Sequence, residues 1–322
     1  MGTYILRRLL ISIPVLFGIT IAGFFALSLT PGDPITARMS PSVLARLSPE
    51  AIALARHQLG LDQPIPIRYL TWLAGVLQGD FGYSVVTGKK ISEEVLPRIG
   101  PTLLLMATSM VIGVVVGIPL GVITALRERS KIDTSLTTAG LLMAATPTFV
   151  LGLLAIYFFA VDLKVLPTGN MVTLGEPFSV GDLLAHLVLP ATILGLANAS
   201  LLMRYTRASM IEVLASDYLT TARSKGLIDS AVIMRHALRN ALIPIITLVG
   251  LLLPDLVGGA IITEQVFAWP GMGRLAVRAA SDRDPALMMG IILIVSIAVL
   301  LSNLLADVGY AVADPRIRYD RS

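Results

Sequence analysis

The sequence predicts an all-α integral membrane protein with about six transmembrane helices. Of its 322 residues, 55% are hydrophobic and only 14% are charged, and the mean hydropathy is +0.80. A soluble domain of this size could not keep so many apolar side chains off its surface. Six stretches are long enough for a helix to cross a bilayer core of about 30 Å, which takes about 20 residues. They are residues 9–32, 99–126, 134–161, 183–203, 241–263 and 285–306.

The first stretch is predicted to stay in the protein as a membrane helix. Arg7 and Arg8 precede it, as in a signal peptide. It is longer than the roughly 7–15 residues of a signal peptide's apolar region, and no small-x-small cleavage pattern follows it. We therefore divide the chain into an N-terminal arm with the first span, an external segment, a membrane core with a cytoplasmic loop at 204–240, and a tail. Their boundaries are 1–32, 33–98, 99–310 and 311–322.

The positive charges predict that both termini lie in the cytoplasm. With the N-terminus inside, the cytoplasmic parts hold fourteen Lys and Arg residues and the two short external loops hold four. Short cytoplasmic loops carry such an excess of Lys and Arg. These residues are dispersed among loops without interleaved aromatic residues, so no nucleic-acid partner is expected.

The external segment is expected to hold two short helices that form an ordered lid or dock. Ser48 and Pro49 have the types preferred at the N-cap and first position of a helix, and Gly60 is placed to end it. Gly79 is placed to end the second helix. Its apolar residues recur at helical spacing: Leu70, Leu73, Ala74 and Leu77. The alternative is a linker without a function of its own.

The second span carries a face of small residues. Gly113, Gly117 and Gly121 recur every fourth residue, which lets another helix approach closely. Helix contact is the predicted role, and a hinge is the alternative. Prolines within or at the edges of the spans predict kinks, because membrane helices tolerate proline. They are Pro14, Pro119, Pro147, Pro190, Pro244 and Pro254.

The sequence carries no pattern typical of an enzyme. It has no cysteine, so thiol catalysis and thiol metal sites are excluded. His57, His186 and His236 are far apart in the sequence, and none lies in a metal-binding motif. The stretch "GYSVVTGKK" has the wrong spacing for a phosphate-binding loop and lacks Ser or Thr after its first lysine. We predict a non-catalytic chain without a metal or cofactor of its own.

Two polar residues inside the spans are candidates for lining a translocation path. Asp255 lies near the middle of the fifth stretch, where an ionised side chain is costly unless it faces water or a partner. The alternative places Asp255 nearer the outer mouth. Asn198 and, more weakly, Asn303 are further candidates, although an amide inside the membrane also joins helices.

The stretch "DYLTTARSKGLIDSAVIMRHALRNALIP" predicts a cytoplasmic helix-turn-helix between two spans. Leu219, Ala222 and Gly226 share one face of the first helix. Ala222 and Gly226 are small, so another chain can approach there, and Arg223 and Lys225 stand beside that face as hydrogen-bond donors. After Gly226, Asp229 or Ser230 is expected to cap the second helix. The pattern indicates a docking surface for a soluble partner, with a solvated loop as the alternative.

This stretch resembles the coupling loop, called the EAA loop, of membrane subunits of binding-protein-dependent ABC importers, in the form of the dipeptide/oligopeptide/nickel permease family. The resemblance runs nearly end to end. It includes "YILRRLL", "TPGDP", "LGLDQPIPIRYLTWL", "GDFGYS", "GIPLGVITAL", "TRASMIEVL", "DYLTTARSKG" followed by "RHALRNALIP", "TEQVFAWPGMGRL" and "DPRIR". Thr220, Thr221 and Ala222 stand where the generic pattern has Glu-Ala-Ala, and Asp255 stands where the family carries a small or uncharged residue.

The resemblance implies a type I ABC importer permease fold in a bacterial or archaeal plasma (inner) membrane. It implies three kinds of partner besides lipid: a second, similar permease subunit, two cytoplasmic ATPase subunits that hold ATP and Mg²⁺, and an external solute-binding protein. The implied cargo is dipeptides or oligopeptides, with nickel or another small solute as the alternative. The residues expected to couple to the ATPase are Asp217, Tyr218, Leu219, Ala222, Arg223, Lys225, Gly226 and Leu227.

Overall fold

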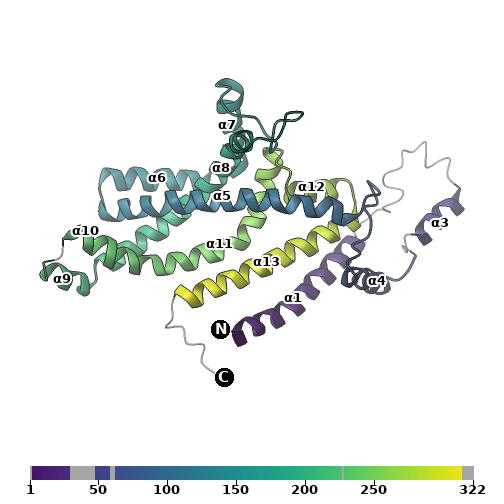
Figure 1. Cartoon of the computed structure of the whole chain (residues 1–322), viewed down its shortest axis with the longest axis horizontal. Coiled ribbons are helices and arrows are strands. Elements are labelled where there is room, and N and C mark those ends of the chain that lie inside the picture. The colour runs from purple at the N-terminus through teal and green to yellow at the C-terminus, as the bar shows by residue number, and fades with distance from the viewer. Residues whose placement is uncertain (1, 30–47, 59–61, 227, 314–322) are drawn as a thin grey trace. The chain divides into compact units, whose positions relative to one another are not determined.

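The computed structural model describes residues 2–29, 48–58, 62–226 and 228–313, and this part of the chain is helical apart from turns and one isolated bridge (Figure 1). The chain forms two compact units, Met1–Gly100 with Arg274–Leu300 and Pro101–Gly273 with Leu301–Ser322. The α-helices are α1 (Gly2–Ser28), α3 (Pro49–Gln58), α4 (Ile65–Leu77), α5 (Ile91–Leu126), α6 (Lys131–Ala145), α7 (Thr148–Ala155), α8 (Val180–Leu214), α9 (Asp217–Ser224), α10 (Asp229–Ala231), α11 (Leu238–Val266), α12 (Met272–Ser281) and α13 (Pro285–Ala313).

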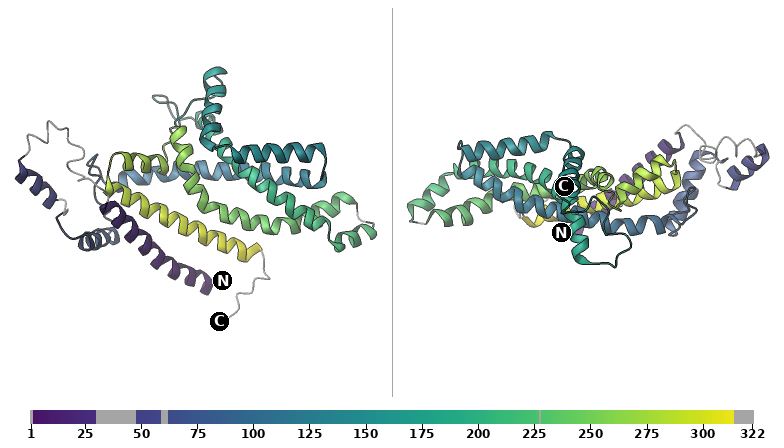
Figure 2. Two further views of the ribbon diagram at one scale, coloured as in Figure 1. Left: turned by 180° about the vertical axis from the view of Figure 1, so that it is seen from behind. Right: turned by 90° about the horizontal axis from the view of Figure 1, so that it is seen from above.

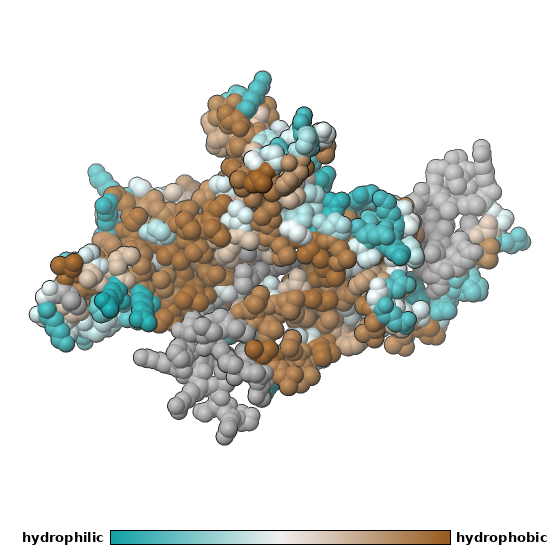
Figure 3. All heavy atoms as spheres, viewed as in Figure 1, coloured by the Kyte–Doolittle hydropathy of each residue, from teal (hydrophilic) through white to brown (hydrophobic). Residues whose placement is uncertain are grey.

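Five of the described helices are long and apolar enough to cross a membrane, and a bent pair brings the number to six. Figure 3 shows hydrophobic side chains gathered along the long helices and hydrophilic ones near α9 and α10. Only 11% of the apolar window in α1 is buried, so most of its apolar side chains face lipid or a partner. The predicted all-α membrane fold is confirmed.

The third predicted span, 134–161, is not one continuous helix. It consists of α6 and α7, the latter extended by a π-helix at Ile156–Asp162, and the two parts are bent by 100°. At the break Thr146 and Pro147 have extended ψ angles of 126° and 134°. Proline disfavours the helical region for the residue before it and has no N–H to donate. Pro147 therefore breaks the span, where the sequence analysis expected a kink.

In the first unit, α4 packs against α1 and the first turns of α13. Phe24, Tyr69 and Met289 form the buried cluster, and Figures 1 and 2 show α1 running beside α13. The Phe24 and Tyr69 rings meet edge to face at 5.5 Å. Aromatic side chains bury the largest apolar areas, so the Tyr69 side of α4 turns inward. Of the four apolar residues at helical spacing in α4, three are exposed and one is half-buried: Leu70, Ala74 and Leu77 are exposed, and Leu73 is half-buried.

The predicted ends of the short helices are largely as expected. The Ser48 hydroxyl accepts a hydrogen bond from Ala51 N at 3.2 Å and caps α3. Gly79 follows the end of α4 with a φ of +81°, a conformation that L side chains rarely adopt. Gly60 lies outside the described residues.

A buried carboxylate holds the "GDFGYS" stretch against the start of α13. Asp284 is 1% exposed. Its Oδ2 accepts a hydrogen bond from Ser84 Oγ at 2.5 Å, and its Oδ1 accepts from Leu287 N at 3.0 Å. The same side chain thus caps a helix and fixes a loop that lies 200 residues earlier in the chain.

In the second unit, α5 lies directly against α8 along the glycine face. A Cβ on Gly117 would lie 2.7 Å from Ala199 O, and one on Gly121 would lie 2.5 Å from Thr206 Cβ. Both distances are shorter than van der Waals contact. On the opposing helix, a Cβ on Gly195 would lie 2.7 Å from Ile112 Cβ. The close backbone approach therefore depends on glycine in both helices.

The "TEQVFAWPGMGRL" stretch folds back on the start of the Pro101–Gly273 unit around a buried acid. Glu264 is fully buried and accepts a hydrogen bond from Thr102 Oγ1 at 2.6 Å, while Thr102 Oγ1 accepts one from Met272 N at 2.8 Å. Trp269 Nε1 donates to Pro101 O at 2.9 Å. A Cβ on Gly271 would overlap the Glu264 carboxylate.

We expect Gly271→Ala to destabilise the protein, because the added methyl group displaces a buried, hydrogen-bonded carboxylate. Overpacking of this kind costs about 1–3 kcal/mol. Thermal unfolding of the purified transporter in detergent measures the loss. Gly181→Ala is the matched control, since a Cβ there would meet only Ser179 Oγ at 3.7 Å. Equal unfolding temperatures for the two variants would contradict the tight fit at Gly271.

Candidate functional site

The candidate coupling site is α9 with the turn that follows it. α8 ends at Leu214, and α9 begins three residues later at Asp217. Gly226 has a φ of +82°, the left-handed conformation with which glycine commonly ends a helix. No described atom lies within 4 Å of the position of a Cβ on Gly226. The glycine is therefore required by the backbone of the turn, and the space around it is open.

The face of α9 that carries Leu219 points into the protein. Leu219 is fully buried, in a cluster with Met210, Val232 and Ala237, and Ala222 packs half-buried against this cluster. An eight-residue helix is too short to be stable alone in water, so it must bury its apolar side against its own chain. Leu219 thus anchors α9 to its own chain.

The opposite side of α9 is exposed. The exposed residues from Asp217 to Gly226 are Asp217, Tyr218, Thr220, Thr221, Ser224, Lys225 and Gly226. The Tyr218 hydroxyl accepts a hydrogen bond from Asn240 Nδ2 at 2.8 Å, which ties α9 to the first turn of α11. The Arg223 side chain and Leu227 lie outside the described residues. The open surface of the loop is thus a polar strip with one described lysine.

Residues that the sequence analysis missed connect the base of this loop to the membrane helices. Arg207 of α8 forms a two-point ion pair with Asp133 of α6, with Nε–Oδ1 and Nη2–Oδ2 distances of 2.7 and 2.8 Å. Asp133 is 4% exposed and also accepts hydrogen bonds from Arg129 N and Thr137 Oγ1. The planar guanidinium matches a carboxylate at two points. α6 and α8 are therefore fixed to each other just before the chain enters α9.

The second helix of the loop begins as α10 and continues through a π-helix, Val232–Ala237, into α11. Its N-cap is Ile228, with no side-chain hydrogen bond. The expected capping by Asp229 or Ser230 is therefore wrong. Ser209 Oγ donates to Ala241 O at 3.0 Å, which joins the end of α8 to the start of α11. The two spans that flank the loop are thus linked to each other as well as to α9.

The two path candidates differ in what the structure describes. Asn198 lies in α8 against Gly113 of α5: a Cβ on Gly113 would be 2.9 Å from Asn198 Cβ. Its amide nitrogen is buried and has no hydrogen-bond partner in the described part of the chain. Asp255 lies in α11, and its side chain is outside the described residues.

Within the described ranges, no group of three or more His, Cys, Asp or Glu side chains is placed to hold a metal ion. His186 instead fixes a loop: its Nδ1 lies 2.7 Å from Gly169 O, and its Nε2 lies 3.4 Å from Asp182 Oδ1. This histidine is accounted for by hydrogen bonding.

Two family models for membrane components of binding-protein-dependent transport systems together match almost the whole chain. Residues 117–319 match the binding-protein-dependent transport system inner membrane component. Residues 1–106 match the N-terminal part of binding-protein-dependent transport system membrane components. The matches meet near the glycine face of α5.

The chain is also similar over its full length to curated proteins. It is 46% identical to a putative peptide permease protein of Brucella suis, with 98% of each chain covered. It is 42% identical to the oligopeptide transport system permease protein AppB of Bacillus subtilis and 41% identical to the glutathione transport system permease protein GsiC of Salmonella typhimurium, with 99% of this chain and 100% of each relative covered.

Among solved structures, the chain resembles an inward-facing conformation of the MetNI methionine ABC transporter. The TM-score is 0.55 at 17% identity, over 69% of this chain and 96% of that chain, which shows the fold. The type I permease fold expected from the sequence is thereby confirmed. The chain is a multi-pass membrane permease subunit and belongs to the family of binding-protein-dependent transport system inner membrane components.

Proposed function

We propose that the chain imports dipeptides or oligopeptides as one permease subunit of an ATP-driven importer, in which it forms half of the translocation pathway. The observation that carries this proposal is the full-length similarity to permeases named for peptide, oligopeptide and glutathione transport. These three relatives are named for peptides or glutathione and not for nickel, which favours peptides over the alternative cargo. ATP hydrolysis belongs to separate subunits, as in the family.

The proposed assembly has a second, similar permease subunit, two ATPase subunits with ATP and Mg²⁺, and a solute-binding protein on the outer side. In this assembly the cytoplasmic side carries the termini and the 204–240 loop, which is supported by the fourteen Lys and Arg residues assigned to that side. The 33–98 segment then faces outward, between the first span and the 99–310 core.

The exposed strip of α9 is the proposed ATPase docking surface. A short helix can bind in a groove as a rigid element when its inner face is held by its own chain. Buried Leu219 and the Tyr218–Asn240 hydrogen bond hold α9 in this way. Thr221, Ser224 and Lys225 are then the contact residues, beside Asp217, Arg223 and the turn at Gly226 and Leu227. Motion of the ATPase subunits would be transmitted to the membrane helices through α9, α10 and the end of α8. This motion would switch the pathway between inward-open and outward-open conformations.

Asp255 and Asn198 are the proposed polar residues of the pathway. Support for Asp255 comes from the high free energy of an unpaired charge inside the membrane. Support for Asn198 comes from its buried amide nitrogen without a partner in the described part of the chain.

The cargo is tested by uptake of labelled dipeptides, oligopeptides and nickel in cells that express this chain with its genomic neighbours. We expect peptide uptake that requires ATP and that Gly226→Trp abolishes, since the substitution strains a turn at a φ of +82° and adds bulk at the docking surface. Uptake of nickel without peptide would overturn the cargo. Transport by this chain alone, without ATP, would overturn the importer itself.

A further inference from the structure

Helix α4 presents three kinds of surface around its axis. Tyr69 and Trp72 face the cluster with Phe24. The side away from the cluster is apolar but exposed: Ile67, Leu70 and Leu77 are 49%, 61% and 77% exposed. Between these two sides lies a flank with Arg68 and Thr71. A helix in water would not leave its most apolar residues outward unless something covers them.

The contacts with α1 give the depth of α4 relative to the membrane. The Thr20 and Tyr69 hydroxyls are 3.0 Å apart, and Phe24 packs on Tyr69. The span of α1 ends at Ser28. At 1.5 Å per residue, Phe24 lies about 6 Å and Thr20 about 12 Å below that end. α4 is thus fixed at the depth of the lipid tails next to the headgroups.

Helix α13 gives the same depth independently. Its span begins at Pro285, and Met289, one turn later, belongs to the cluster with Tyr69. One turn of helix places Met289 about 6 Å below the start of the span. Helices that lie in the membrane interface bury their apolar faces about 5–10 Å into the boundary between headgroups and acyl chains. The two spans therefore agree on an interfacial position for α4.

We propose that α4 is an interfacial helix that lies in the leaflet where α1 ends, with Ile67, Leu70, Ala74 and Leu77 against lipid acyl chains and Arg68 among the headgroups. Apolar side chains of the neighbouring α1 are exposed as well: Phe17 and Ile21 are 39% and 42% exposed. Arg68, a residue of the basic type that anchors interfacial helices, flanks this face.

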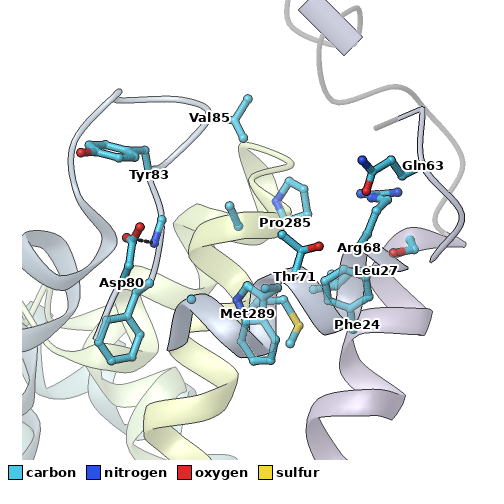
Figure 4. A pocket seen from close by; sticks show the side chains of 16 residues that line it. Phe24, Leu27, Gln63, Arg68, Thr71, Asp80, Tyr83, Val85, Pro285 and Met289 are labelled. Atoms are coloured by element: carbon cyan, nitrogen blue, oxygen red, sulfur yellow. Dashed lines mark hydrogen bonds between the residues drawn. The ribbon is translucent and has the colours of Figure 1, made fainter. Parts of the chain in front are cut away.

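The pocket beside α4 supports the placement of Arg68. It has a volume of about 360 Å³ and is lined mainly by apolar groups, among them Phe24, Trp72 and Met289 (Figure 4). The Arg68 guanidinium lies 5.9 Å from the Phe24 ring centre and makes no ion pair within the described residues. In this arrangement the guanidinium can bind a lipid phosphate, and the apolar groups below it can contact the acyl chains of the same lipid.

The proposal is tested by spin labels on single cysteines, which is direct because the chain has no cysteine. Leu70→Cys and Leu77→Cys are labelled in the full transporter, reconstituted in phosphatidylethanolamine and phosphatidylglycerol vesicles. The accessibility of each spin label to molecular oxygen, which concentrates in lipid, is compared with its accessibility to the water-soluble nickel(II) ethylenediamine diacetate. We expect high oxygen and low nickel-reagent access, as for Val15→Cys in the middle of α1.

Two matched positions calibrate the result. Lys89→Cys, on an exposed turn, should show water-like access, and Thr71→Cys, on the flank of α4, should show more nickel-reagent access than Leu70→Cys one residue earlier. Water-like access at both leucines would overturn the proposal. Low access of both reagents would overturn it too, because it would show that a protein surface, not lipid, covers α4. Ile67→Cys provides a third reading if either leucine variant assembles poorly. These outcomes do not depend on the transported cargo.

Discussion

Replacement of Ser224 by tryptophan is expected to abolish peptide uptake while leaving the chain folded and in the membrane. Ser224 is the last residue of α9 and is exposed, so the indole group extends outward from the proposed docking strip. Bulk in a packed contact costs about 1–3 kcal/mol, which weakens docking by roughly 5- to 150-fold. Uptake of labelled peptide and co-purification of the ATPase subunits measure the two effects.

Ser224→Trp separates bulk from backbone strain more cleanly than Gly226→Trp does. Gly226 has a positive φ, so any large side chain there disturbs the turn even without a partner. Ser224→Ala is the matched control and should transport normally. Leu219→Asp should lose uptake for a different reason, because an unpaired carboxylate in the buried cluster detaches α9. Full uptake and normal co-purification in Ser224→Trp would remove this face from the docking site.

The second large effect is expected at the glycine face of α5. Gly121→Leu should prevent accumulation of the folded protein, because even the first added carbon would lie 2.5 Å from Thr206 Cβ and 2.7 Å from Met203 O. Forced separation of α5 from α8 also breaks the neighbouring contacts of Gly117. Because the clash involves backbone and Cβ atoms, the cost lies at or above the upper end of about 1–3 kcal/mol and exceeds the gain of about 1 kcal/mol from removing glycine from a helix. Membrane abundance and detergent unfolding temperature measure the result.

The matched control lies in the same helix. Gly100 has no described atom within 4 Å of the position of a Cβ, so Gly100→Ala should leave abundance unchanged or raise it slightly. Gly121→Ala should fall between the control and Gly121→Leu. If all three variants accumulate alike, the close α5–α8 contact does not limit folding.

The sequence predicted the spans and the glycine face well because both depend on local patterns. An apolar run long enough to cross a membrane, or a glycine at every fourth residue, can be recognised from a few turns of helix alone. The size of the bend at Pro147 was underestimated. Proline in a membrane helix can produce a small kink or a complete break, and the packing of neighbouring helices decides which. The inward side of α4 could not be predicted, since spacing alone does not rank Tyr69 above Leu70.

At the candidate site, the helix and turn around α9 were predictable, but the orientation of α9 was not. Leu219 was visible as an apolar residue, yet only the folded chain provides Met210, Val232 and Ala237 to bury it. The Asp133–Arg207 pair joins residues of ordinary types far apart in the sequence. No local signal distinguishes them, apart from the position of both at the edges of predicted spans.

The packing of α5 and α6 on α8 also sets an order for biosynthesis. Thr206 leaves the ribosome 85 residues after Gly121, which at about 5–20 residues per second is a delay of about 4–17 seconds. During that time the glycine face of α5 contacts only lipid or the insertion machinery. The helix tolerates the delay, because Ser109 Oγ and Thr124 Oγ1 donate to carbonyls of α5 itself. Asp133, by contrast, must await Arg207, so the nascent chain holds a carboxylate without its ion-pair partner until its fourth span is made.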